Sequence, residues 1–214
     1  TDLPNPLPMP TELGNLQVKV DGVPAPLFFV SPGQINIFVP TSAPQSGVAE
    51  FEVVETTTGR VLASAPVQMN VASPGLFTAH ANGTGQVLAF NQDGTPNSPT
   101  NPAARGEYIT LYGTGQGVVP GAPPDGEAPQ APIPTPDLPR VIIGACFVDD
   151  CGEDSEPVQY SGLAPGLIGV WQIKVRIPKQ TAPSSEQPVA VAVLFRNIPS
   201  TGGEPQFVAT TISV

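Results

Sequence analysis

Charge, histidine and long apolar runs are all scarce in this sequence. Only 12% of the 214 residues are charged, and there is a single histidine. Surface helices need charged residues on their solvent side, and the 29 prolines would break them, so the composition argues against a helical bundle. The longest apolar run, 189–195, has the length of a strand and falls short of the roughly 18 residues of a membrane span.

The few charges are mostly negative, with 8 basic against 18 acidic residues and a formal net charge of -10. Such a surface repels phosphate backbones and anionic lipid headgroups, so we expect no nucleic-acid partner and no membrane insertion. The chain begins at Thr1 without an initiator methionine or a signal peptide, which we interpret as a mature secreted chain or an excerpt of a longer one.

What the sequence has in plenty is turn residues between short apolar segments. Hydrophobic residues make up 40% of the chain, which is enough to bury a core, and 22 glycines join the prolines as turn formers. This pattern predicts an all-β protein. The predicted strands are 16–20, 25–30, 34–40, 50–54, 65–71, 86–90, 107–112, 141–143, 158–160, 170–177, 188–196 and 206–214.

An internal repeat divides the chain. Segments 26–40 and 157–178 both read as a strand, a Pro-Gly turn and a Gln-Ile strand that alternates and ends at proline. Two copies predict two tandem immunoglobulin-like β-sandwich domains, 1–74 with an extended proline-rich arm at its start, and 75–214. The proline-rich segment 120–139 is interpreted as a loop inside the second domain, because a boundary there would leave about 45 residues, too few for a stable core.

The two cysteines, Cys146 and Cys151, flank a four-residue tip. Strand ends joined by such a tip can bring the Cβ atoms to bridging distance, so we predict a disulfide and an oxidising, extracellular or cell-surface location. A zinc site is disfavoured, because two thiols and one histidine are too few ligands.

Several longer motifs stand out, in 16–36, 85–86, 91–103 (with Asn91-Gln92-Asp93-Gly94-Thr95), 106–115 and 162–166. These motifs resemble a known family. The chain resembles, over nearly its whole length, the uncharacterised C-terminal domain of exported proteins from Solibacter and other Acidobacteria, and its second half is similar to IPT/TIG immunoglobulin-like domains. The resemblance implies an exported module at the end of larger proteins, with no known activity. The segment Cys146–Glu156 departs from the family, which usually has a short apolar turn there.

No combination of residues predicts catalysis. His80 is interpreted as a surface or junction residue, and no Gly-x-Ser-x-Gly motif accompanies it. The acidic residues between Asp149 and Glu156 are interpreted as a solvated loop, with a calcium site as the alternative. Gly113-Thr114-Gly115-Gln116-Gly117 is interpreted as a turn or bulge, because a proline and no helix follows it. We therefore expect no catalytic residues, no cofactor and no metal site.

Two functions remain. The first is a non-enzymatic extracellular structural or adhesive module, such as a subunit of a surface appendage or filament assembled through extended arms or strand exchange, with itself or neighbouring surface proteins as partner. The alternative is a carbohydrate-binding accessory module of a secreted enzyme. That alternative requires exposed aromatic rings, whereas Trp171, Tyr108 and Tyr112 are expected in or beside the core.

Overall fold

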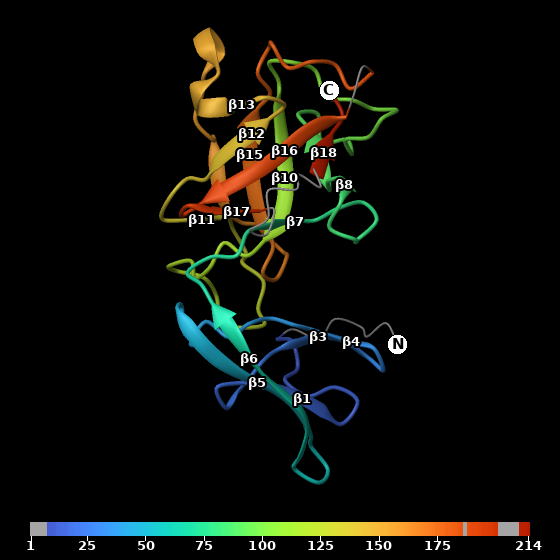
Figure 1. The fold of residues 1–214 in the computed structure, drawn as a ribbon, viewed down its shortest axis with the longest axis vertical. Helices are drawn as coiled ribbons and strands as arrows, with labels where there is room; N and C mark the ends of the chain where they lie inside the picture. The colour runs from blue at the N-terminus through green and yellow to red at the C-terminus, as the bar shows by residue number, and fades with distance from the viewer. Residues whose placement is uncertain (1–7, 186–187, 201–209) are drawn as a thin grey trace. The chain divides into compact units, whose positions relative to one another are not determined.

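The computed structural model describes residues 8–185, 188–200 and 210–214, and the chain divides into two compact units. Unit 1 comprises residues 1–71, 121–131 and 165–169, and unit 2 comprises 72–120, 132–164 and 170–214. Within the described residues the regular elements are β-strands and two short 3-10 helices, with no α-helix (Figure 1). The predicted all-β class is confirmed.

The described residues of unit 1 form six strands in two sheets. A four-stranded antiparallel sheet has the order β2-β1-β5-β6, and β3 pairs with β4 in a separate hairpin. Figure 1 shows β5 and β6 as one long hairpin, whose turn is formed by residues 56–59. The strands are β1 (Leu16–Val20), β2 (Val23–Pro24), β3 (Leu27–Ser31), β4 (Gln34–Ile37), β5 (Gly47–Glu55) and β6 (Arg60–Met69).

The core of unit 1 is small. Val18 on β1, Ala25 and Leu27 are buried together, and Val53 on β5 packs against them from partial exposure. The remaining contacts come from partly buried residues of the hairpin and of the segment before β1, namely Leu13, Val30, Ile35 and Ile37. The hydrophobic effect therefore stabilises mainly the part of the sheet around β1 and its neighbours.

Unit 2 contains two six-stranded sheets. The first has the order β11-β14-β15-β10-β7, with β9 also on β10; the second has the order β13-β12-β16-β18-β8, with β17 on β16. All pairings are antiparallel except β8 with β18. The first sheet contains β7 (Gly75–Leu76), β9 (Ala89–Asn91), β10 (Tyr108–Thr114), β11 (Ile133–Pro134), β14 (Tyr160–Leu163) and β15 (Trp171–Arg176). The second contains β8 (Gly85–Gln86), β12 (Arg140–Ile143), β13 (Cys146–Phe147), β16 (Val189–Phe195), β17 (Ile198–Pro199) and β18 (Thr210–Ile212), with the 3-10 helices η1 (Val148–Asp150) and η2 (Gly152–Asp154) after β13.

One hydrophobic core joins these two sheets. β15 and β16 alternate strictly between buried and half-buried residues, so each presents one face to the core. The rings of Trp171 on β15 and Phe195 on β16 lie 5.1 Å apart between their centroids, and both are fully buried. Unit 2 is therefore a β-sandwich, with its largest side chains between the layers.

The repeated sequence segment forms an antiparallel hairpin in both units. In unit 1 it is β3 and β4, joined by the Pro32-Gly33 turn; in unit 2 it is β14 and β15, joined by a longer connection. β15 buries every second residue, whereas β4 leaves its alternate residues only half-buried. The same alternation thus leads to different burial, because β15 is covered by a complete second sheet.

The proline-rich segment is shared between the units, whereas the sequence interpretation placed all of 120–139 in the second domain. Residues 121–131 belong to unit 1, where Asp125 Oδ2 accepts a hydrogen bond from Thr41 N at 2.9 Å. Residues 9 and 10 are held in unit 1, since Met9 N donates to Gly126 O at 2.9 Å and Pro10 O accepts from Leu27 N at 2.8 Å. These two residues end the predicted arm, 1–10, of which residues 1–7 lie outside the described residues.

Trp171 provides a test of the sandwich core. We expect Trp171→Ala to lower the free energy of unfolding of unit 2 by about 3–5 kcal/mol, because it removes the largest buried side chain and leaves a cavity. The measurement is denaturant unfolding followed by circular dichroism, since Trp171 is the only tryptophan. Leu138→Ala is the control, because Leu138 is 55% exposed in the same unit. Equal unfolding midpoints for the two variants would contradict the assigned core.

Candidate functional site

The predicted disulfide is present at one end of the second sheet of unit 2. Cys146 is the first residue of β13, which pairs with β12, and Cys151 directly follows η1. The disulfide therefore closes the turn between the two cysteines, with a Cα–Cα distance of 5.6 Å. The side-chain amide of Gln180 donates to the carbonyl oxygen of Cys151 and lies 2.9 Å from its Sγ. Gln180 therefore also connects the disulfide loop to the segment that follows β15.

The acidic residues within and after the disulfide loop pair with separate cations. Asp149 accepts two hydrogen bonds from the Arg140 guanidinium, at 2.8 and 3.1 Å, and this contact raises the pKa of Arg140. Asp154 forms an ion pair of 2.9 Å with Lys179. In the described part of the chain, no group of three or more histidine, cysteine, aspartate or glutamate residues is placed to hold a metal ion.

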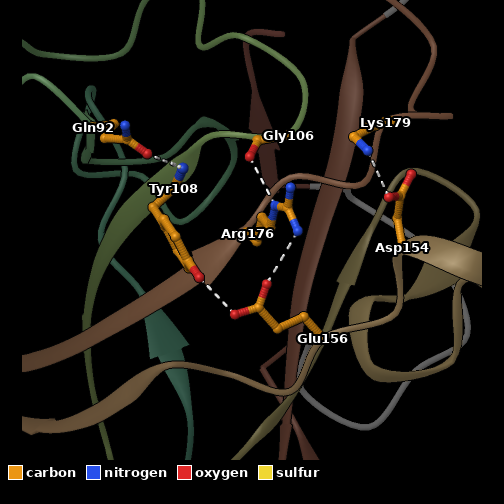
Figure 2. Close-up of polar contacts among 7 residues, drawn as sticks. All are labelled: Gln92, Gly106, Tyr108, Asp154, Glu156, Arg176 and Lys179. Atoms are coloured by element: carbon orange, nitrogen blue, oxygen red, sulfur yellow. Dashed lines mark hydrogen bonds and ion pairs between the residues drawn. The ribbon is translucent and has the colours of Figure 1, made fainter.

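Glu156 is the most connected of these acids (Figure 2). One carboxylate oxygen accepts a 2.5 Å hydrogen bond from the Tyr108 hydroxyl, and the other lies 3.4 Å from the Arg176 guanidinium. Tyr108 on β10 and Arg176 on β15 are direct cross-strand partners, and Arg176 also donates to the carbonyl oxygen of Gly106 at 2.8 Å. Glu156 therefore joins the loop to two neighbouring strands of the first sheet.

This arrangement disfavours proton transfer by Tyr108. The hydrogen bond to Glu156 is the main cause that raises the pKa of Tyr108 above its ordinary value, with smaller contributions from burial and from the carboxylate charge. A raised pKa keeps the phenol protonated at neutral pH, and both carboxylate oxygens of Glu156 already have partners. The contacts of Glu156 with Tyr108 and Arg176 attach the loop to the sheet.

The asparagine-rich motif 91–103 forms a second polar network, and this one is buried. Asn97 donates to Asn91 Oδ1 at 2.9 Å and to the carbonyl oxygen of Ser213 at 2.8 Å. Its own Oδ1 accepts from the Ser213 backbone N at 2.9 Å and from the Gln86 amide at 2.8 Å. Asn97 therefore connects the motif to the C-terminal residues and to β8.

The exposed end of the same motif is an ordered turn. Asp93 accepts hydrogen bonds from the hydroxyl and the backbone N of Thr95, and these bonds lower the pKa of Asp93. Asn101 donates to Thr95 Oγ1 at 2.7 Å and to the carbonyl oxygen of Pro96 at 2.9 Å. The polar residues that make this motif conspicuous in the sequence thus hold the loop in one conformation.

In the glycine-rich segment 113–117, close contact with a neighbouring backbone explains two of the glycines. A Cβ atom on Gly113 would lie 2.4 Å from the carbonyl oxygen of Gly75, and one on Gly115 would lie 1.7 Å from that of Ser73. Gly115 also has a positive φ of 81° and accepts a hydrogen bond from Ser73 N at 2.7 Å. These glycines are therefore required by the close approach of 73–75 to the end of β10.

His80 is exposed, as expected of a surface residue.

The aromatic side chains lie where the sequence analysis expected them. Trp171 is fully buried and donates from its indole N–H to Ser161 Oγ at 2.9 Å, while Tyr108 and Tyr112 are half-buried. The Tyr112 ring packs edge-on against Phe90, with 5.6 Å between the centroids. A sugar-binding platform that used Trp171, one of the rings considered for the carbohydrate-binding alternative, would need that ring at the surface.

The fold and these networks define an all-β protein of two units, in which the prominent polar motifs fasten loops to sheets. Comparison of the chain with models of protein families, with curated proteins and with solved structures finds no match. The resemblance to the exported acidobacterial domain and to IPT/TIG domains stays a prediction. None of the described segments forms a helix with the length and apolar character needed to cross a membrane.

The buried network predicts a large effect for one amide. We expect Asn97→Ala to lower the free energy of unfolding of unit 2 by about 3 kcal/mol, because it leaves several buried donors and acceptors without partners. The measurement is denaturant unfolding followed by the fluorescence of Trp171. Ser98→Ala is the control, since the Ser98 hydroxyl contacts only an exposed neighbour, Thr100. A loss no greater than that of the control would show that the network does not stabilise the fold.

The clamp at Glu156 predicts a change in tyrosine ionisation. Because the folded-state pKa of Tyr108 is raised, its hydrogen bond stabilises the fold below the ordinary value of 10.0 and is lost as the pH rises through the raised pKa. We expect Glu156→Gln to lower the pKa of Tyr108, measured by ultraviolet absorbance of the phenolate. The pKa of Tyr160, which burial raises, is expected to stay unchanged.

Glu153→Gln is the matched control, because Glu153 is an exposed acid of the same loop. Identical titration curves for the wild type and the Glu156→Gln variant would rule out the hydrogen bond.

Proposed function

We propose that the chain is a non-enzymatic, extracellular structural or adhesive module, and specifically a subunit of a cell-surface appendage or filament that assembles through extended arms or strand exchange. The proposal rests on one observation: the polar residues that are prominent in the sequence form hydrogen bonds within the protein. Glu156 and Asn97 each hydrogen-bond to groups of the protein itself, so their contribution is rigidity of the unit. A rigid sandwich with fastened loops suits a part that transmits force or displays a surface.

The disulfide between Cys146 and Cys151 supports the extracellular location in this proposal. Disulfides persist in oxidising environments and are rare in the cytosol. The net charge of -10 supports a protein partner over a nucleic acid or an anionic membrane.

The paired strands restrict which segment can act as the arm. β1 pairs with β2 and β5 of its own unit, so this strand already has partners. β18, in the last predicted strand, pairs with β16 and β8. Met9 and Pro10 are hydrogen-bonded in unit 1, which leaves 1–7 as the arm to test.

The experiment compares the full chain with a chain that lacks residues 1–7, by negative-stain electron microscopy and by sedimentation. We expect the full chain to form regular polymers and the shortened chain to form shorter polymers or none, with an unchanged unfolding midpoint. Shortening stops before Met9 because its loss would break the contact with Gly126. Dispersed monomers from both chains, at every concentration and with native material, would overturn the assembly proposal.

A further inference from the structure

A short loop of unit 2 presents an asparagine at its tip. The segment 79–86 is closed at its base by a hydrogen bond of 2.8 Å from Ala79 N to Gln86 O. Residues 79–83 are all exposed, and Asn82 lies among them. The side chain of this asparagine can therefore be reached from the solvent without any opening of the fold.

The side-chain amide of Asn82 has a defined orientation. Thr84 donates to Asn82 Oδ1 from its backbone N at 3.0 Å and from its hydroxyl at 3.1 Å. A backbone N–H can only donate, so the atom that it meets is the carbonyl oxygen, and the amide nitrogen lies on the other side. In the described part of the chain Asn82 Nδ2 has no hydrogen-bond partner, so the loop presents this nitrogen to the solvent.

A buried threonine holds the loop in this conformation. The hydroxyl of Thr78 accepts a hydrogen bond from Gly83 N at 3.1 Å and lies 3.4 Å from Asn82 Oδ1. The backbone N of Ala81 donates to the carbonyl oxygen of Thr78 at 3.0 Å. Both the carbonyl end of the Asn82 amide and the backbone beside it are therefore fixed to the unit, while the amide nitrogen is not.

The sequence at this tip has the spacing of an N-glycosylation acceptor. Asn82-Gly83-Thr84 matches Asn-x-Ser/Thr, and no other asparagine of the chain has a serine or threonine two positions later. This spacing allows the N–H and the hydroxyl of the third residue to reach the side-chain oxygen of the first, and both contacts are made here. The one sequence match thus coincides with an exposed loop and a suitably oriented amide.

The surface at the base of the loop is apolar and lacks charge. Leu88 N donates to Phe77 O at 2.7 Å, and the side chains of these neighbours are 43% and 37% exposed. The sequence contains no charged residue from 72 to 92. N-linked sugars are bulky and hydrophilic, so a sugar chain at the tip of the loop would supply hydration that charged side chains do not supply in this segment.

We propose that Asn82 Nδ2 is the attachment point of an N-linked glycan, with a glycosyl diphosphate as the sugar donor. The nitrogen forms a bond to the anomeric carbon of the sugar, and the bond from that carbon to the phosphate oxygen breaks. The diphosphate leaves with the electron pair, and the amide loses one proton to the solvent. Thr84 is a positioning residue, because it holds the amide oxygen and leaves the nitrogen exposed. The inference rests on the extracellular location in the proposed function and adds a modification to it.

The test is mass spectrometry of proteolytic peptides from the native protein, with fragmentation to locate the modified residue. We expect a sugar chain on Asn82 and none on Asn70, which is exposed in the same part of the sequence but is followed two positions later by Ala72. An unmodified Asn82 in the native protein would overturn the inference.

Three variants of the full chain, produced in the organism of origin, identify the atom that carries the sugar. Asn82→Gln removes the acceptor, Thr84→Ala removes the hydroxyl, and Thr84→Ser is the matched control that keeps it. We expect the glycopeptide to be lost in the first two variants and kept in the third, with unfolding midpoints that show all three fold. A sugar chain that persists in Asn82→Gln would place it on a hydroxyl group, and one that persists in Thr84→Ala would remove the role of Thr84; either result overturns the inference.

Negative-stain imaging of the same native protein separates this inference from the proposed function. Polymers built from chains with an unmodified Asn82 would overturn the glycan and leave the filament proposal standing. A glycan on Asn82 in dispersed monomers would support the inference and count against assembly.

Discussion

The fold of unit 2 depends on the burial of apolar side chains between its two sheets, with the contact of Trp171 and Phe195 at the centre. Each of these residues comes from a strand with strict alternation, so the burial of one face fixes the register of the whole strand. Because burial of the core fixes the arrangement of the two sheets, the loops at their ends can be long and rich in proline. The polar networks then fix those loops to a frame that already exists.

Hydrogen bonds between residues far apart in the sequence fix these loops to the sheets. Glu156 reaches two strands of one sheet, and Asn97 connects a loop to the C-terminal residues. Such networks stabilise only when every buried group has a partner, which Asn97 achieves through four contacts. The motifs around Glu156 and Asn97, which look functional in the sequence, therefore hold loops in place in this structure.

Unit 1 repeats a hairpin of unit 2 without a complete second layer. β4 and β15 have the same alternation, but only β15 is covered on its apolar face. The shortage of cover extends to β6, whose core-side residues stay exposed. Unit 1 therefore has a small core with partly exposed neighbours, while unit 2 has a larger core between two sheets.

The sequence by itself determined the all-β class, most of the strands and the disulfide. Proline and glycine exclude long helices, alternation is a local property, and a separation of five residues in the sequence leaves two cysteines little freedom. It did not determine that 121–131 pack in unit 1, that β6 begins at Arg60, or that Glu156 meets Tyr108 and Arg176. These facts depend on which strands become neighbours and in which register. Strand order follows from the burial of faces over the whole unit, so only the tertiary structure could decide them.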